Sequence, residues 1–335
     1  MNKNVTMSDI AKEMGVSTVT VSKALGDKDG VSEEVRREIK KKAEAMGYRY
    51  NSLAKSIKDG VSGNIGVIVS ERYFSDNAFY ANLYQRNVVE LSKQNYSCIL
   101  EIVSKEDEHK DILPAMIVNN KVDGVIVLGQ MKSHYVSHIV ETGMPHVLQD
   151  FYDEKVGEDA IVSDNVYGAY LLTKYLLEQG HDSIAFVGNI YATSSIMDRY
   201  LGYYRALLET KREIRPSWII GDRDEQNGTY TELSLPKQLP KAFFCNCDEV
   251  AFSLVNQLKA MGVKVPEDVS VVGFDDYIFA TVCEPKLTTY KVALETLSET
   301  TVDAILKKIK NPDYKIGRKV VGGSIVYRDS VKKRK

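Results

Sequence analysis

Residues 5–25 have the sequence VTMSDIAKEMGVSTVTVSKAL, in which two short helical patterns are separated by Gly15. Thr6 and Asp9 have the spacing of a helix-capping box, and the apolar residues that follow recur with the helical period. Ser17 is a favourable N-cap for a second helix. Two helices joined by about four residues predict a helix-turn-helix unit.

The outer face of the second helix is the first candidate site. If Val21 faces the core, the 100° step between residues leaves Thr18, Val19, Ser22 and Lys23 on the outside. In a DNA major groove, Val19 would contact a thymine methyl group, and Thr18 and Lys23 would bond to base edges. The alternative is a generic three-helix bundle whose solvent-facing side carries these residues.

The rest of the first sixty residues predicts a third helix and a linker. Ser32 caps a helical pattern that ends near Gly47, so we expect a DNA-binding head over residues 1–50. Residues 51–62 are expected to be a hinge helix and linker, too short to be stable alone. Its Leu53 and Ile57 share a face that either wedges into a minor groove or packs against the next domain.

Composition limits the function classes. The 335 residues carry a net charge of −2, but residues 1–62 hold 12 Lys and Arg against 9 Asp and Glu. This small basic excess suits a polyanion-binding module, or is simply a solvated surface. The chain has no apolar run long enough for a membrane span or a secretory signal, so we expect a cytoplasmic protein without a membrane partner.

No enzyme or metal motif stands out. The phosphate-loop, nucleophile-elbow and H-E-x-x-H patterns are absent, so we expect no catalytic activity and no cofactor. His134 and His138 have metal-ligand spacing, but surface histidines are the better interpretation. Cys245 and Cys247 form a conceivable redox pair that lacks an activating group.

From residue 65 onward, strand and helix patterns alternate, with one helix predicted over residues 107–119. This predicts an α/β fold with two doubly wound parallel-sheet lobes, each covered by helices on both faces. Ligands of such sheets bind beyond the carboxyl ends of the strands, so the residues after each strand are the candidates for a binding cleft.

The chain resembles the LacI/GalR family of bacterial transcription regulators over nearly its whole length. The most specific match is residues 5–25, followed by VSEEVR at 31–36, NSLAKSI at 51–57 and VPEDVSVVGFDD at 265–276. The resemblance implies periplasmic-binding-protein-like lobes of type I. We expect one lobe from residues 63–161 plus 291–320 and the other from 162–290 plus 321–335.

The resemblance also implies a homodimer that binds double-stranded, pseudo-palindromic operator DNA, most simply as a repressor. By position, Thr18, Val19 and Lys23 would read bases, and Ser17, Thr20 and Ser22 would approach phosphates or sugars. Further expected DNA-binding residues are Thr6, Asn51, Leu53, Ala54 and Ile57. Many members have arginine at the position of Lys23, and lysine cannot form the bidentate fork to guanine.

For the ligand cleft, the resemblance points to Asp150, Arg199 and Asp275, a set that suits a polyol because each makes charge-assisted hydrogen bonds. Phe79 and Tyr80, and also Tyr277, would stack on a sugar ring. Cys247 stands where many sugar-binding members have asparagine. The sequence therefore predicts a small carbohydrate effector; the alternatives are a regulator that answers a purine or a two-lobed solute-binding protein.

Overall fold

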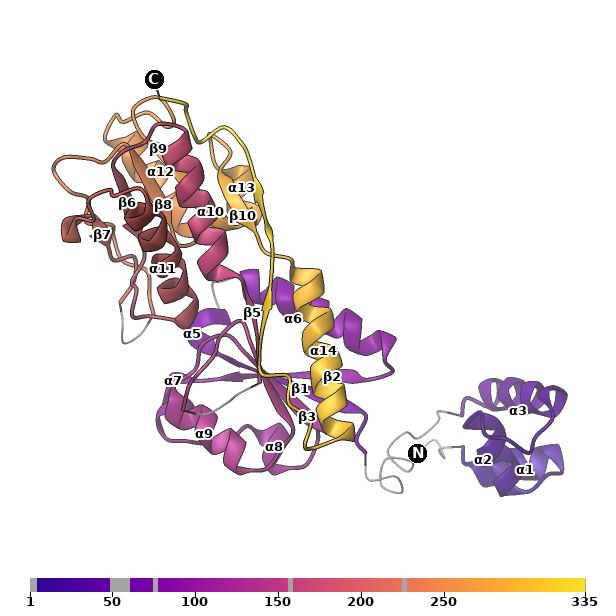
Figure 1. Ribbon diagram of the computed structural model, residues 1–335. Helices are drawn as coiled ribbons and strands as arrows, with labels where there is room; N and C mark the ends of the chain where they lie inside the picture. Colours follow the sequence, from indigo (N-terminus) through magenta and orange to yellow (C-terminus); the bar gives the residue numbers. More distant parts are fainter. Residues whose placement is uncertain (1–4, 49–60, 75–77, 156–158, 225–227, 335) are drawn as a thin grey trace. The chain divides into compact units, whose positions relative to one another are not determined.

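The computed structural model describes residues 5–48, 61–74, 78–155, 159–224 and 228–334 (Figure 1). The chain divides into two compact units, Met1–Ser62 and Gly63–Lys335. Each unit is described by itself below.

The first unit contains three helices, α1 (Met7–Met14), α2 (Thr18–Leu25) and α3 (Glu33–Ala45). Each begins at a residue whose side chain accepts a backbone hydrogen bond, namely Thr6, Ser17 and Ser32. Gly15 ends α1 at φ 64°, a left-handed conformation that glycine adopts without strain. The small core is Ile10, Ala11, Val21, Ala24, Ile39 and Ala43. The helix-turn-helix prediction is confirmed.

The second unit contains two six-stranded sheets, each at the centre of one lobe. The N-lobe sheet has the order β11-β5-β4-β3-β1-β2, and all its strands are parallel. The N-lobe elements are β1 (Asn64–Ser70), α5 (Glu71–Phe74), α6 (Ala78–Lys93), β2 (Ser97–Val103), α7 (Lys105–His109), α8 (Ala115–Val118), β3 (Gly124–Leu128), α9 (Ser133–Glu141), β4 (His146–Gln149), β5 (Ala160–Ser163), α14 (Leu294–Lys310) and β11 (Arg318–Val321).

The C-lobe sheet has the order β12-β10-β9-β8-β6-β7, in which only β12 runs antiparallel to its neighbour. Its elements are α10 (Asn165–Glu178), β6 (Ile184–Val187), α11 (Ser194–Glu209), the 3-10 helix η1 (Pro216–Trp218), β7 (Ile219–Ile220), β8 (Ala242–Cys245), α12 (Asp248–Ala260), β9 (Ser270–Asp275), α13 (Ile278–Val282), β10 (Thr288–Lys291) and β12 (Ser324–Val326).

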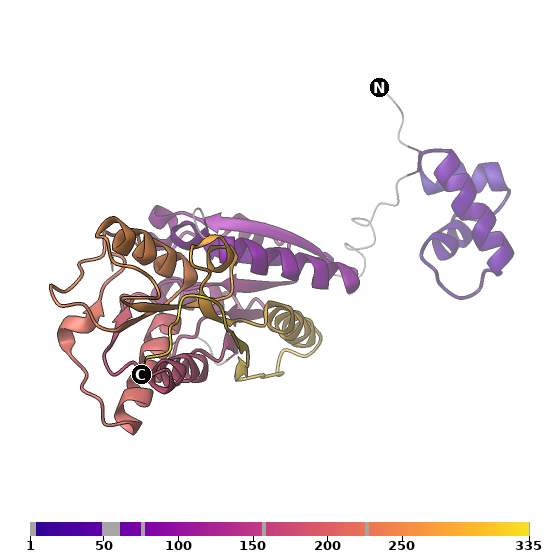
Figure 2. The same cartoon turned by 90° about the horizontal axis from the view of Figure 1, so that it is seen from above.

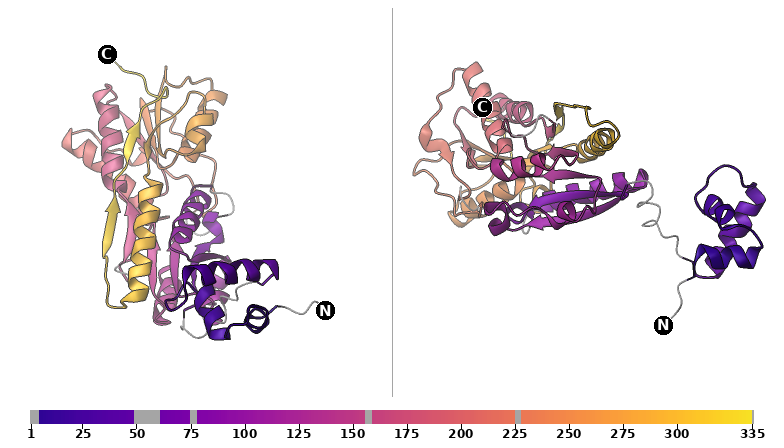
Figure 3. Two further views of the ribbon diagram at one scale, coloured as in Figure 1. Left: turned by 90° about the vertical axis from the view of Figure 1, so that its right-hand side faces the viewer. Right: turned by 90° about the horizontal axis from the view of Figure 1, so that it is seen from below.

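The chain passes from one sheet to the other after β5, after β10 and after β11. The last long helix, α14, therefore returns to the N-lobe, where it packs beside α6 although about 200 residues separate them (Figures 2 and 3). The central strands β3, β4, β6 and β8 are almost entirely buried, as expected for parallel strands covered on both faces.

The predicted α/β fold with two parallel-sheet lobes is confirmed, but two local predictions were wrong. The sequence pattern predicts one helix over residues 107–119, whereas α7 ends at His109 and α8 begins only after Pro114. Proline lacks the N–H that a continuous helix needs. The pattern also predicts none of the short strands β5, β10, β11 and β12, which span only three or four residues each.

Candidate DNA-reading face and ligand cleft

Helix α2 has the two faces that the sequence predicts. Val21 and Ala24 are fully buried, whereas the side chain of Val19 is 63% exposed, with Thr18 and Ser22 exposed beside it. Lys23 is half-buried. An apolar side chain such as Val19 gains hydrophobic free energy when it leaves water. The outer face of α2 therefore suits a partner that supplies an apolar group.

The start of α2 is held by Ser17, whose Oγ accepts a hydrogen bond from the Thr20 backbone N–H at 3.0 Å and lies 2.8 Å from Thr20 Oγ1. Thr6 is exposed at the start of α1, where its hydroxyl donates to Asp9 at 2.7 Å. The other predicted DNA-binding residues, Asn51, Leu53, Ala54 and Ile57, lie outside the described residues.

Arg36 of α3 positions α2 and was missed by the sequence analysis. Its Nη1 donates to the Lys23 carbonyl at 3.3 Å and its Nη2 to the Lys28 carbonyl at 2.8 Å. A guanidinium on the terminal carbonyls of a helix interacts favourably with the helix dipole. Thirteen residues separate Arg36 from Lys23, too many for a local pattern to indicate the contact.

The second candidate site is a cleft at the carboxyl ends of the strands. Asp150 follows β4 in the N-lobe, Asp275 ends β9 in the C-lobe, and Arg199 lies on α11. All six predicted effector-binding residues line one cavity of about 40 Å³. They are Phe79, Tyr80, Asp150, Arg199, Cys247 and Asp275. Tyr277 is absent from this lining; its backbone N–H donates to Asp248 at 2.8 Å.

Arg199 bonds to three residues on the C-lobe side. Its guanidinium donates to the Asp275 carboxylate at 3.0 Å, the Asn246 carbonyl at 2.6 Å and the Asn165 side chain at 2.8 Å. It also lies 3.9 Å from the centroid of the Phe274 ring. Burial raises the pKa of Asp275 to about 7, and Arg199 opposes part of this shift.

On the N-lobe side, Asp150 is 3% exposed and burial raises its pKa to about 6. The Tyr80 hydroxyl hydrogen-bonds to this carboxyl group. The Oδ1 atom of Asp150 is buried and has no hydrogen-bond partner among the described residues. The rings of Tyr73, Phe79 and Tyr80 pack edge to face beside it. The N-lobe thus contributes a carboxyl group next to an aromatic wall.

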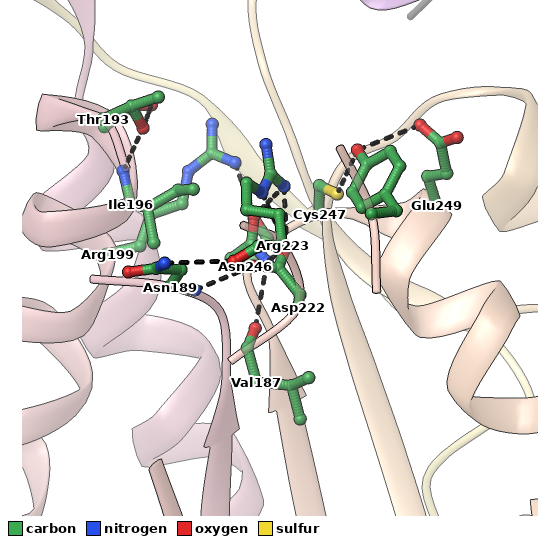
Figure 4. A network of polar contacts seen from close by, with 12 residues as sticks. Val187, Asn189, Thr193, Ile196, Arg199, Asp222, Arg223, Asn246, Cys247 and Glu249 are labelled. Atoms are coloured by element: carbon green, nitrogen blue, oxygen red, sulfur yellow. Dashed lines mark hydrogen bonds and ion pairs between the residues drawn. The ribbon is translucent and has the colours of Figure 1, made fainter. Parts of the chain in front are cut away.

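Asp222 and Arg223 form a second polar cluster that the sequence analysis missed (Figure 4). Arg223 donates to Asp222 at 2.7 Å, and Asn246 donates to the same carboxylate at 2.8 Å. The other Asp222 oxygen accepts from the Asn189 backbone N–H at 2.7 Å. Arg223 lines the cleft, as do Tyr73 and Tyr230. Arg199 and Arg223 both donate to Asn246, Arg199 to its carbonyl at 2.6 Å and Arg223 to its side-chain oxygen at 3.3 Å (Figure 4).

Cys247 is buried in the cleft wall, with its Sγ 4.0 Å from the Tyr230 hydroxyl. Burial raises the pKa of Cys247 to about 12, so its thiol stays protonated near neutral pH. The pKa of Cys245 is raised as well, mainly by burial. Neither thiol therefore has the character of a redox-active cysteine.

The described residues contain no group of three or more His, Cys, Asp and Glu side chains placed to hold a metal ion. In the same part of the chain, no helix is long and apolar enough to cross a membrane.

Two protein families match this chain. Residues 6–51 match the bacterial regulatory proteins of the lacI family, and residues 173–331 match a periplasmic binding protein-like domain. A transcriptional repressor PurR from Vibrio parahaemolyticus is 28% identical over 98% of this chain and 99% of its own length. The ribose operon repressor of Haemophilus influenzae is 28% identical over 97% of this chain and 98% of its own length.

Solved structures of this architecture are also similar. The lac repressor dimer bound to operator and the anti-inducer ONPF superposes with a TM-score of 0.81 at 21% identity, covering 98% of this chain and all of the other. The transcriptional regulator CelR in complex with cellobiose gives a TM-score of 0.69 at 23% identity, with the same coverage. At these identities the structures show the shared fold.

Proposed function

The chain belongs to the LacI family of DNA-binding transcriptional repressors, and we propose that a small carbohydrate bound between its two lobes controls its affinity for operator DNA. The observation that supports this proposal is the convergence of Asp150, Arg199 and Asp275 from both lobes on one cleft.

We assign base reading to Thr18, Val19 and Lys23 of α2. Ser17, Thr20 and Ser22 at the same helix would contact phosphates or sugars, and Thr6 would do so from the start of α1. Asn51, Leu53, Ala54 and Ile57 would form the hinge that enters the minor groove. A homodimer would place two such heads on the halves of a pseudo-palindrome, since a two-fold protein matches a two-fold site.

A carbohydrate suits the cleft because carboxyl groups accept sugar hydroxyl hydrogens and a guanidinium donates to ring or hydroxyl oxygens. The aromatic wall of Phe79 and Tyr80 would cover the apolar face of a pyranose. Among the relatives, the names ribose operon repressor and CelR–cellobiose complex are consistent with this class.

A purine is the second candidate, and the name of the PurR relatives is what favours it. The same carboxyl and guanidinium groups would pair with the edge of a base, and the aromatic wall would stack on its face. A thermal-shift series with hexoses, pentoses, adenine, guanine and hypoxanthine separates the two. A purine that stabilises the full chain where no sugar does would overturn the carbohydrate assignment.

The control of DNA binding would follow from differential affinity. An effector shifts the equilibrium between two lobe arrangements only by the difference in its affinity for them. Three chain segments join the lobes, after β5, β10 and β11, so a ligand that contacts both lobes changes how they are held together. The hinge would transmit this change to the heads.

Selection of duplexes from a randomised pseudo-palindromic library tests the DNA-binding assignment. The selected duplex should bind the full chain with an affinity that falls steeply between 50 and 200 mM salt, because released counterions set that slope. If the library yields no preferred sequence, the reading-face assignment fails.

A further inference from the structure

A second cavity lies beside the cleft in the C-lobe. Its volume is about 350 Å³, and its walls come from α12, α13 and the segment that follows β7. Phe252 and Phe279 form one wall, with ring centroids 5.3 Å apart. Leu233 adds a buried apolar side chain, and Ser253 and Asn256 add polar groups. We call this cavity the side chamber.

Tyr230 lines both the side chamber and the cleft. Its hydroxyl lies 3.2 Å from the Glu249 carboxylate and 4.0 Å from Cys247 Sγ. One face of its ring packs on the Arg223 guanidinium, 4.7 Å from the centroid. Because Tyr230 lines both cavities, rotation of its side chain would change the shape of both.

The two cavities differ in capacity. The cleft holds about 40 Å³, enough for only a few water molecules, since a cavity needs roughly 10–15 Å³ to hold one. The side chamber, at about 350 Å³, falls in the range of ~300–1,000 Å³ typical of ligand pockets. A sugar ring that enters the cleft must push the walls of the cleft apart, whereas the side chamber already has space for a ring of the same size.

The chamber walls also have the chemistry of a sugar subsite. The faces of Phe252 and Phe279 suit the C–H face of a pyranose. Ser253 and Asn256 are exposed, and in the described part of the chain neither side chain makes a hydrogen bond. Together they offer a hydroxyl and an amide, which donate to and accept from sugar hydroxyls.

From this arrangement we infer that the effector is a disaccharide whose first ring lies in the cleft and whose second ring lies in the side chamber, with Tyr230 turned aside between them. The inference rests on the proposed carbohydrate function and names the size of the ligand. It assigns Ser253, Asn256, Phe252 and Phe279 to the recognition of the second ring.

The test compares cellobiose, lactose, maltose and sucrose with their constituent hexoses on the full chain, by thermal shift and calorimetry. We expect one disaccharide to bind at least tenfold more tightly than either of its hexoses. Ser253→Trp, which fills the chamber, should remove that advantage and leave hexose binding unchanged. Ala260→Trp, at an exposed position of α12 outside the chamber lining, should change neither.

Asn256→Ala gives a second measure that does not depend on a bulky side chain. It should weaken disaccharide binding about fivefold, the effect of one lost hydrogen bond, and leave hexose binding unchanged. If hexoses bind but no disaccharide exceeds them, the side-chamber inference is overturned and the proposed function stands. If no carbohydrate binds while a purine does, the carbohydrate function itself fails.

Discussion

Side chains on the DNA-reading face are exposed, whereas those in the ligand cleft are buried and already hydrogen-bonded to other residues. On α2, Val19 is 63% exposed and Thr18 and Ser22 face solvent. In the cleft, the side chain of Arg199 is only 6% exposed and is already bonded to three other residues. A ligand of the first site meets unengaged groups, whereas a ligand of the second must compete with bonds that also stabilise the fold.

Substitution of Arg199 tests this contrast with the largest expected effect. Arg199→Ala leaves the buried Asp275 carboxylate and the Asn246 carbonyl without their partner, which typically costs about 3–5 kcal/mol of the free energy of unfolding. The response to the effector should be lost as well. Urea unfolding and a ligand-dependent thermal shift measure the two effects.

Arg205→Ala is the matched control, because Arg205 lies on the same helix and pairs with Glu209 at 3.0 Å on the surface. Exposed pairs of this kind contribute about 0–1 kcal/mol. Equal destabilisation by the two variants would show that the Arg199 contacts do not hold the C-lobe together.

The pH dependence of stability should carry the signature of Asp275. Its folded pKa of about 7 lies above the ordinary value of 3.8, so between these values the folded state keeps a proton that the unfolded state releases. Its contribution to stability therefore falls as the pH rises from about 4 to about 7 and is constant above. The loss is at most about 4 kcal/mol, at ~1.4 kcal/mol per pKa unit.

Asp275→Asn removes this titration. The stability of the variant relative to the original protein should therefore rise between pH 4 and pH 7 and level off above, as measured by urea unfolding at a series of pH values. Parallel stability curves for the two proteins would contradict the raised pKa of Asp275.

The same contrast explains which parts of the structure could be predicted from the sequence. The caps Thr6, Ser17 and Ser32 act on backbone groups three residues away, so a local pattern reveals them. The family resemblance pointed to Asp150, Arg199 and Asp275. Asp150 follows β4 and Asp275 ends β9, at the edge where parallel sheets bind ligands.

Other cleft residues could not be predicted in this way. Asp222 and Arg223 follow the two-residue strand β7, but nothing in the local sequence shows that they bond to each other and to Asn189. Their partner Asn246 lies more than twenty residues further on, so only the folded sheet brings the cluster together. Tyr230 lies between β7 and β8, where it forms an isolated β-bridge with Arg223, and no pattern separates it from a surface tyrosine.

A third prediction concerns the reading face, where substitutions should weaken the discrimination between DNA sequences without lowering the stability of the protein. Val19→Ala and Thr18→Ala should each reduce discrimination between the selected operator and single-base variants by about 1–3 kcal/mol. Since both side chains are exposed, the free energy of unfolding should change by no more than about 0.5 kcal/mol. Binding titrations on matched and mismatched duplexes give the first quantity.

Ser8→Ala, at an exposed position of α1, is the control and should alter neither quantity. If Val19→Ala destabilised the head as strongly as it weakened discrimination, the valine would be part of the core and the separation between face and core would be wrong.

The smallest expected effect, about 1 kcal/mol, distinguishes the two roles of Ser17. Ser17→Ala removes the cap on the Thr20 N–H and should lower the stability of the head by this amount. Ser17→Asp keeps a capping oxygen and adds a charge that the helix N-terminus favours, so stability should be retained. The same charge would repel a DNA phosphate. If Ser17 only caps α2, Ser17→Asp binds operator as the original protein does. If Ser17 also faces a phosphate, the operator affinity of Ser17→Asp falls while its melting temperature does not. Raising the salt concentration should then narrow the difference in affinity between the two proteins, because salt screens the repulsion.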